Sequence, residues 1–185
     1  MNKYLLKYYL KRGVVIAFIL LFAIVATRFI YDKFSKENDQ VTPVENLEVT
    51  FHEKEKDKIS ITKVNPLTDA LGLSSKGYTI SIKNNSKMNL KYTVKILDDK
   101  EEYDLDGCSD TKLPIESIKL GYHKDKEHNN IVLLNELENG VLATDIIEPG
   151  KTADYTIRLW IDKDTNLNLD KDGHYHGLIK VEESE

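Results

Sequence analysis

Cysteine is almost absent from this sequence, since Cys108 is the only one in 185 residues. One cysteine cannot form a disulfide within the chain, so a hydrophobic core must hold the fold, and a domain of about 140 residues can supply such a core. We expect the thiol to be partly buried, with a redox or intermolecular role as the alternative. Repeats and low-complexity runs are also lacking, and no long helical period appears after residue 36. The body of the chain is therefore not expected to be helical.

Motifs of known catalytic centres are also missing. The zinc-protease pattern HExxH starts at His52, but Lys56 stands where the second histidine belongs, and residues 47–51 alternate like a strand. No nucleophile elbow or phosphate loop accompanies the Ser, His and Asp residues. His174 and His176 share one strand face without a third metal ligand nearby, so we expect them to be surface histidines. The sequence predicts that the protein is not an enzyme.

Basic residues are outnumbered by acidic ones outside the N-terminal region. Residues 1–36 carry a net charge of +6, which leaves −11 for residues 37–185 of a chain whose total is −5. An acidic domain repels phosphate backbones, so no nucleic acid partner is expected. Acidity is compatible with divalent cations or simply with solubility.

One uncharged run, residues 14–27, stands near the N-terminus. A helix over residues 14–31 would span roughly 27 Å, close to the thickness of the hydrocarbon core of a membrane. Arg28 lies in its last turn and can snorkel to the headgroups. Residues 1–13 form a basic tail, which favours a cytoplasmic N-terminus. We therefore predict a signal-anchor, with the protein in the cell membrane as a single-pass chain and its C-terminal domain extracellular.

A cleaved signal peptide is the competing interpretation of the same run. Ile24-Val25-Ala26 is a tolerable small-residue cleavage site, and fourteen uncharged residues fit an h-region. Against cleavage, Arg28-Phe29-Ile30-Tyr31 would be a poor mature start, and the n-region is long. In either case the body of the protein lies outside the cytoplasm.

Period-two alternation dominates the remainder. Residues 32–46 are polar, include Pro43 and are expected to form a linker, and residues 47–185 are expected to form one extracytoplasmic domain. Alternation is typical of half-buried antiparallel strands. We predict a mainly β fold, an antiparallel β-sandwich of jelly-roll or immunoglobulin-like type. The expected strands are residues 47–51, 58–64, 78–83, 90–96, 115–122, 130–134, 140–147, 155–161 and 175–181.

Alternation also predicts which side chains form the core. In residues 155–161 the core face is Tyr155, Ile157, Leu159 and Ile161. Trp160 on the other face should be less buried than they are, unless both faces of the sheet are covered. In the last strand the face opposite His174 and His176 should be core. That face consists of Tyr175, Gly177, Ile179 and Val181.

Turn residues separate the strands, such as Lys76-Gly77, Asn139-Gly140 and Pro149-Gly150. Another turn, Asn84-Asn85-Ser86, also fits a glycosylation sequon, with a plain turn as the alternative. Residues 69–73 have the composition of a single helical turn.

The segment before the last strand alternates side-chain oxygens and ends in glycine. A calcium loop needs several such oxygens on a sharply turning segment. Counted from Asn168, the twelfth position is Ile179 instead of a bidentate Glu, and counted from Asp162, the sixth is Leu167 instead of Gly. We expect a solvated hairpin loop without a cofactor, and a weak calcium site is the alternative. Its ligands would be Asp162, Asp164, Asn168, Asp170 and Asp172.

Five segments, taken in order, resemble the camelysin/TasA group of secreted proteins from Gram-positive bacteria. The resemblance covers roughly residues 45–182 and lies in strand-and-turn motifs. These motifs are Asn65-Pro66-Leu67-Thr68-Asp69 through Gly72, Tyr78-Thr79-Ile80-Ser81-Ile82-Lys83-Asn84, Glu148-Pro149-Gly150-Lys151-Thr152, Tyr155-Thr156-Ile157-Arg158-Leu159-Trp160-Ile161-Asp162 and Gly177-Leu178-Ile179-Lys180-Val181.

The resemblance implies an exported jelly-roll sandwich at the cell surface, where such proteins form biofilm-matrix fibres. Their subunits are similar to donor-strand systems, in which a free N-terminal strand completes a neighbouring sheet. Those relatives have a cleaved leader, whereas residues 28–31 favour retention here. Camelysin's protease activity does not carry over, because no metal-ligand motif is present.

These observations predict a non-catalytic, membrane-anchored cell-surface protein that acts in envelope or biofilm-matrix assembly or adhesion. Its partners would be the membrane, through residues 14–31, and other copies of itself or surface and matrix proteins. An accessory or ligand-binding module of a membrane complex is one alternative. A secreted fibre subunit, formed after leader cleavage, is the other.

Overall fold

The computed structural model describes residues 16, 21–27, 40–53, 56–62, 65–102, 112–165 and 173–184. The chain divides into two compact units, residues 1–38 and residues 39–185. In the first unit, residues 21–27 are helical. Within the described ranges, no helix is both long enough and apolar enough to cross a membrane. Most of the predicted span, residues 14–31, lies outside those ranges, and the anchor stays a prediction.

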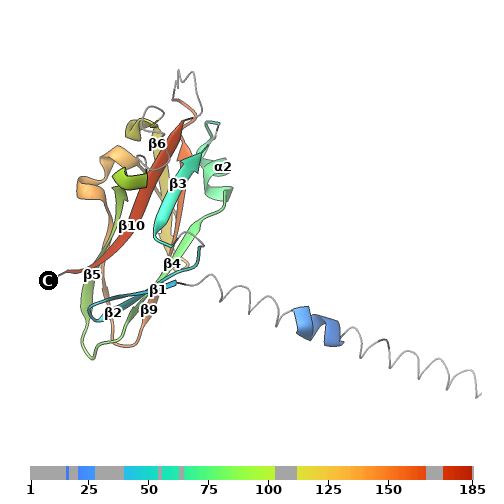
Figure 1. The fold of residues 1–185 in the computed structure, drawn as a ribbon, viewed down its shortest axis with the longest axis vertical. Coiled ribbons are helices and arrows are strands. Elements are labelled where there is room, and N and C mark those ends of the chain that lie inside the picture. Colours follow the sequence, from blue (N-terminus) through green and yellow to red (C-terminus); the bar gives the residue numbers. More distant parts are fainter. Residues whose placement is uncertain are drawn as a thin grey trace, which may run out of the picture. The chain divides into compact units, whose positions relative to one another are not determined.

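The second unit consists mainly of strands in two antiparallel sheets (Figure 1). One sheet has six strands in the order β1-β2-β4-β9-β6-β7, and the other has four in the order β3-β10-β5-β8. The predicted mainly β, antiparallel fold is confirmed. The strands are β1 (Gln40–Val44), β2 (Leu47–Phe51), β3 (Lys58–Thr62), β4 (Tyr78–Asn84), β5 (Leu90–Asp98), β6 (Ile118–Lys124), β7 (Asn130–Leu133), β8 (Val141–Ile147), β9 (Thr152–Ile161) and β10 (His174–Ser184).

The core lies between the inner faces of the two sheets. As the alternation predicts, β4 buries Ile80 and Ile82, and β10 buries Ile179 and Val181. Short helices accompany the strands, residues 100–102 are also helical, and the predicted single turn is α2. The other helices are α2 (Asp69–Ser74), η2 (Ile115–Ser117), η3 (Leu134–Glu136) and η4 (Glu138–Gly140).

Strand β1 lies in the segment where the sequence indicates a linker. It pairs with β2 along its whole length, from Gln40 opposite Phe51 to Val44 opposite Leu47. A proline inside a strand is tolerated at a sheet edge, where its missing N–H faces no partner. In the sequence Pro43 indicates a linker. In the structure it is compatible with β1, because β1 is the outermost strand of its sheet.

The Trp160 side chain is 0% exposed, so the exception to the prediction, a sheet covered on both faces, applies. Trp160 is not part of the core between the sheets. Helix α2 lies against it on the outer face of the six-stranded sheet, so closely that a Cβ on Gly72 would stand 2.2 Å from the indole Cδ2 atom. This part of the sheet is therefore covered on both faces.

Candidate functional site

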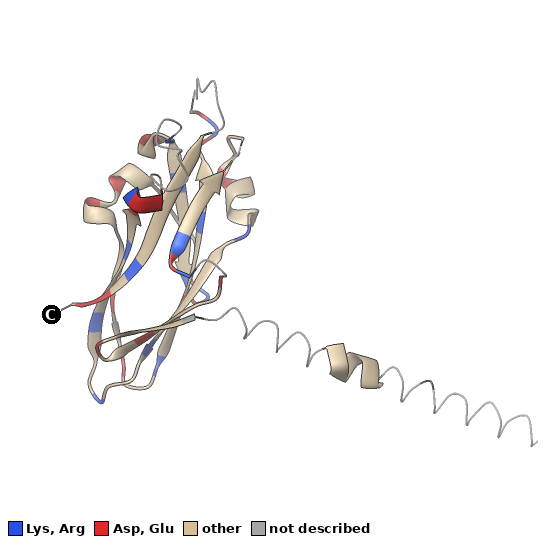
Figure 2. Cartoon of the chain, viewed as in Figure 1, with Lys and Arg blue, Asp and Glu red and all other residues tan. Residues whose placement is uncertain are grey.

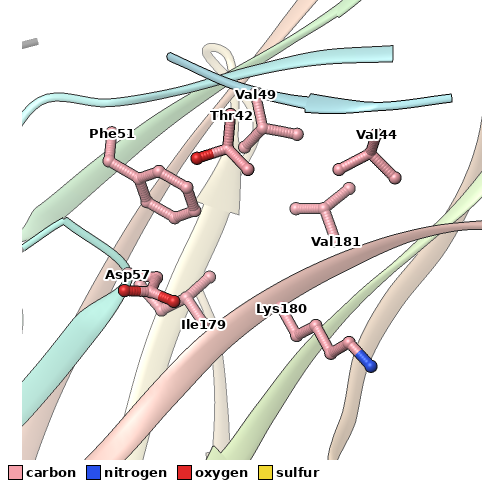
Figure 3. A pocket seen from close by; sticks show the side chains of 8 residues that line it. All are labelled: Thr42, Val44, Val49, Phe51, Asp57, Ile179, Lys180 and Val181. Atoms are coloured by element: carbon pink, nitrogen blue, oxygen red, sulfur yellow. The ribbon is translucent and has the colours of Figure 1, made fainter. Parts of the chain in front are cut away.

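An apolar groove opens between the β1–β2 hairpin and β10 (Figure 3). Its volume is about 190 Å³. In Figure 3, Val44 of β1 faces Val181 of β10, and the Phe51 ring lies above Ile179. The lining residues are Thr42, Val44, Val49, Phe51, Asp57, Ile179, Lys180 and Val181.

The groove runs beside a half of β10 that has a strand on one side only. Strand β3 pairs with His174–Leu178 of β10. On the other side, β5 pairs with β10 from Gly177 to Ser184. Among the described strands, the stretch from Ile179 to Ser184 therefore has β5 as its sole neighbour, and one edge of its backbone is open.

The direction of the backbone groups on this open edge follows from one hydrogen bond. The Ile179 N–H donates to the Asp57 carbonyl oxygen at 2.7 Å, on the side where β3 begins. Backbone groups of an antiparallel strand alternate between its two sides. Val181 and Glu183 thus direct their N–H and C=O groups to the same open side. Such a row of unpaired backbone groups can form hydrogen bonds with the backbone of an extended peptide.

One end of the groove is bounded by contacts between the β1–β2 turn and the end of β10. The Asn46 side-chain amide donates to both carboxylate oxygens of Glu183, at 3.4 and 3.3 Å. The Asn46 backbone N–H donates to the same carboxylate at 3.4 Å. These are long, exposed hydrogen bonds, so each contributes little stability.

Comparisons with protein-family models, curated proteins and solved structures give no match to this chain. The resemblance of residues 45–182 to the camelysin/TasA group stays a prediction. Function is therefore inferred from the geometry of the described residues.

The proposed calcium ligands are only partly within the described structure. Asp162 pairs with Lys119, whose Nζ lies 3.2 Å from Oδ1 of Asp162 and 2.9 Å from Oδ1 of Asp69. Asp164 is exposed and pairs with Lys163 at 2.7 Å. The other three residues, Asn168, Asp170 and Asp172, lie outside the described residues, as does Cys108. The solvated loop and its alternative, a weak calcium site, both stay predictions.

The last strand buries the predicted core face. The sequence predicts both of its histidines at the surface, and His176 is not there. The His174 and His176 rings stack with centroids 6.1 Å apart. His176 is only 7% exposed, so describing it as a surface residue is wrong. Asp99 and Leu113 lie beside the edge of β10 here, because the Asp99 N–H donates to the His176 carbonyl and the Leu113 N–H to the His174 carbonyl.

Three side chains on the outer face of the six-stranded sheet have the residue types of a catalytic triad. His52 Nε2 lies 2.9 Å from the Ser81 hydroxyl. The Ser81 hydroxyl in turn donates to Asp154 Oδ1 at 2.6 Å. In a nucleophilic triad the histidine accepts the serine proton and the carboxylate orients the histidine. Here the serine proton goes to the carboxylate, so this arrangement does not activate Ser81.

A polar network inside the sandwich was not visible in the sequence. The Tyr92 and Tyr155 hydroxyls, from opposite sheets, lie 2.9 Å apart and fully buried. Burial raises the pKa of Tyr92 to about 12. Lys124 and Asp145 pair beside them, and the hydrogen bond to Asp145 raises the pKa of Lys124. Figure 2 shows that basic and acidic residues are interspersed along the strands of both sheets.

Asn84, the acceptor residue of the sequon, is 0% exposed. Its amide nitrogen donates to the Met88 and Ile147 carbonyls at 2.7 and 2.9 Å. Its carbonyl oxygen accepts the Ser86 N–H at 2.8 Å. A glycan cannot be attached to this side chain without breaking these bonds, so the turn interpretation holds.

Proposed function

We propose that this chain is a non-catalytic, membrane-anchored cell-surface protein, acting in envelope or biofilm-matrix assembly or adhesion. Residues 14–31 would hold it in the membrane with the N-terminus cytoplasmic, and the sandwich, of jelly-roll type, would stand outside. The observation that carries the proposal is the open half of β10 beside the apolar groove. A partner's extended strand would pair with Val181 and Glu183 and place apolar side chains in the groove.

Other sheet edges support this choice, because each carries a feature that hinders pairing. In β1, Pro43 offers no N–H to a further strand. In β8, the Ile146 N–H already donates to the Asp145 carboxylate at 2.7 Å. Strand β7 has only four residues. Proline, charge and short length are common means of protecting edge strands from pairing.

Two alternatives use the same groove. As an accessory module of a membrane complex, the protein would bind a defined membrane partner instead of matrix polymers or its own copies. As a fibre subunit, it would lose its leader, and intact mass in the secreted fraction would begin at Thr27 or later.

Val181→Pro tests the strand-acceptor site, with Val181→Ala as the matched control. Both variants lose the valine contacts, but only proline removes the N–H that faces the open edge, and this N–H makes no bond to β5. We expect Val181→Pro to capture fewer matrix proteins and copies of itself from intact cells than Val181→Ala. Equal capture by both variants would contradict the proposed site.

A further inference from the structure

We propose that the Tyr78 hydroxyl caps the free edge of β3 and prevents other strands from pairing there. The restriction of strand addition to β10 rests on the proposed function, but the cap itself stands on the geometry of β3. Tyr78 is the first residue of β4, in the six-stranded sheet, whereas β3 is an edge strand of the four-stranded sheet.

The hydroxyl of Tyr78 engages both backbone groups of Ser60. The Ser60 N–H donates to the hydroxyl oxygen at 3.1 Å, and the hydroxyl donates to the Ser60 carbonyl at 3.2 Å. A neighbouring antiparallel strand would use the same donor and acceptor of one residue. The tyrosine thus occupies the place of a strand partner.

Ser60 is the residue on which such a cap has the greatest effect. It is the middle residue of the five in β3 and lies opposite His176 of β10. Because its N–H and C=O turn to Tyr78, the groups of Ile59 and Ile61 face β10. An incoming strand would therefore need the Ser60 groups at the centre of its contact.

Without the cap, β3 has the properties of a pairing edge. Its sequence, Lys-Ile-Ser-Ile-Thr, contains no proline and alternates isoleucine with polar residues. Ile59 and Ile61 are buried, so the strand is fixed in place with its outer edge extended. Strands of this kind template pairing with other chains unless they are covered.

Tyr78→Phe tests the cap, with Tyr122→Phe as the matched control. Tyr122 belongs to the same sheet and is partly buried against the core, but its hydroxyl makes no hydrogen bond among the described residues. With the full chain in detergent micelles, we expect Tyr78→Phe to speed hydrogen exchange at the Ser60 amide about twofold to tenfold. It should also cause concentration-dependent association in sedimentation, and Tyr122→Phe should do neither.

A second substitution shows which edge the association uses. Ser60→Pro removes the outward N–H without removing a bond to β10, so adding it to Tyr78→Phe should abolish the association. Adding Val181→Pro to Tyr78→Phe should leave the association intact, since β10 is not involved. If Tyr78→Phe sediments like Tyr122→Phe, the cap is refuted. If Val181→Pro abolishes the association, pairing occurs at β10 and the cap is refuted, while the proposed function is supported.

Discussion

The hydroxyls of Tyr92 and Tyr155 join the two sheets through a single buried hydrogen bond. Their rings meet edge to face, with centroids 6.3 Å apart. Burial raises the pKa of both hydroxyls above the ordinary value of 10, and for Tyr92 to about 12. The unfolded chain therefore loses these protons at a lower pH than the folded chain does.

This difference predicts a loss of stability in alkali. Below pH 10 both states hold the tyrosine protons, and their contribution to the free energy of unfolding is fully present. Between pH 10 and about 12 only the folded state holds the proton of Tyr92, so stability falls with rising pH. We expect Tyr92 alone to account for about 2–3 kcal/mol over this range, at about 1.4 kcal/mol per pH unit. Chemical unfolding followed by circular dichroism at several pH values measures it.

A double variant, Tyr92→Phe with Tyr155→Phe, provides the control. It removes both partners of the bond together, which costs far less than leaving one buried hydroxyl unpaired. We expect the variant to fold at neutral pH and to lose less stability in alkali. If the free energy of unfolding of the double variant falls as steeply between pH 10 and about 12 as that of the original protein, the loss of stability comes from other groups.

At the scale of elements, helix α2 covers Trp160 on the outer face of β9. Its contact is close because Gly72 has no side chain: a Cβ there would lie 2.2 Å from Trp160 Cδ2. We predict that Gly72→Ala displaces the helix and destabilises the protein by about 1–3 kcal/mol. The helix-propensity gain of at most about 1 kcal/mol does not offset this.

Trp160 is the only tryptophan, so its fluorescence reports on this contact directly. We expect the emission of Gly72→Ala to shift to longer wavelength as water reaches the indole. Ser74→Ala, at an exposed position of the same helix, should leave the spectrum and stability nearly unchanged. A native-like spectrum for Gly72→Ala would mean that α2 does not cover the ring.

Trp160 also marks how far the sequence could predict the fold. Alternation identifies the two faces of β9 correctly, but it cannot show that a short helix distant in sequence covers one of them. The same limit applies to β1, where Pro43 is compatible with either a linker or an edge strand. The groove depends on β3 beginning only at Lys58, opposite Leu178, which leaves the rest of β10 without this neighbour. Tertiary pairing, not local pattern, decides where each strand begins and stops.

At the scale of the whole molecule, residues 162–173 connect the six-stranded sheet to the four-stranded one. If this connection binds calcium, binding restrains both sheets together. A dissociation constant of about 10⁻⁴–10⁻³ M, as in extracellular modules, would stabilise the fold by about 1.4–2.7 kcal/mol at about 10 mM calcium. We expect the Tm to rise, and Asp170→Ala with Asp172→Ala to abolish the rise. No shift at several millimolar calcium would identify a solvated loop.

The position of β10 has a consequence for the order of folding. This strand lies between β3 and β5, yet it follows every other described strand in the chain. The four-stranded sheet therefore cannot be completed before β10 has been synthesised, although β5 and β8 can pair earlier. Pairing between β3 and β10 joins residues more than 110 positions apart, and contacts this distant close slowly. Until then the apolar inner faces of the earlier strands stay uncovered. A chain that stops before His174 should therefore aggregate instead of forming a smaller stable domain.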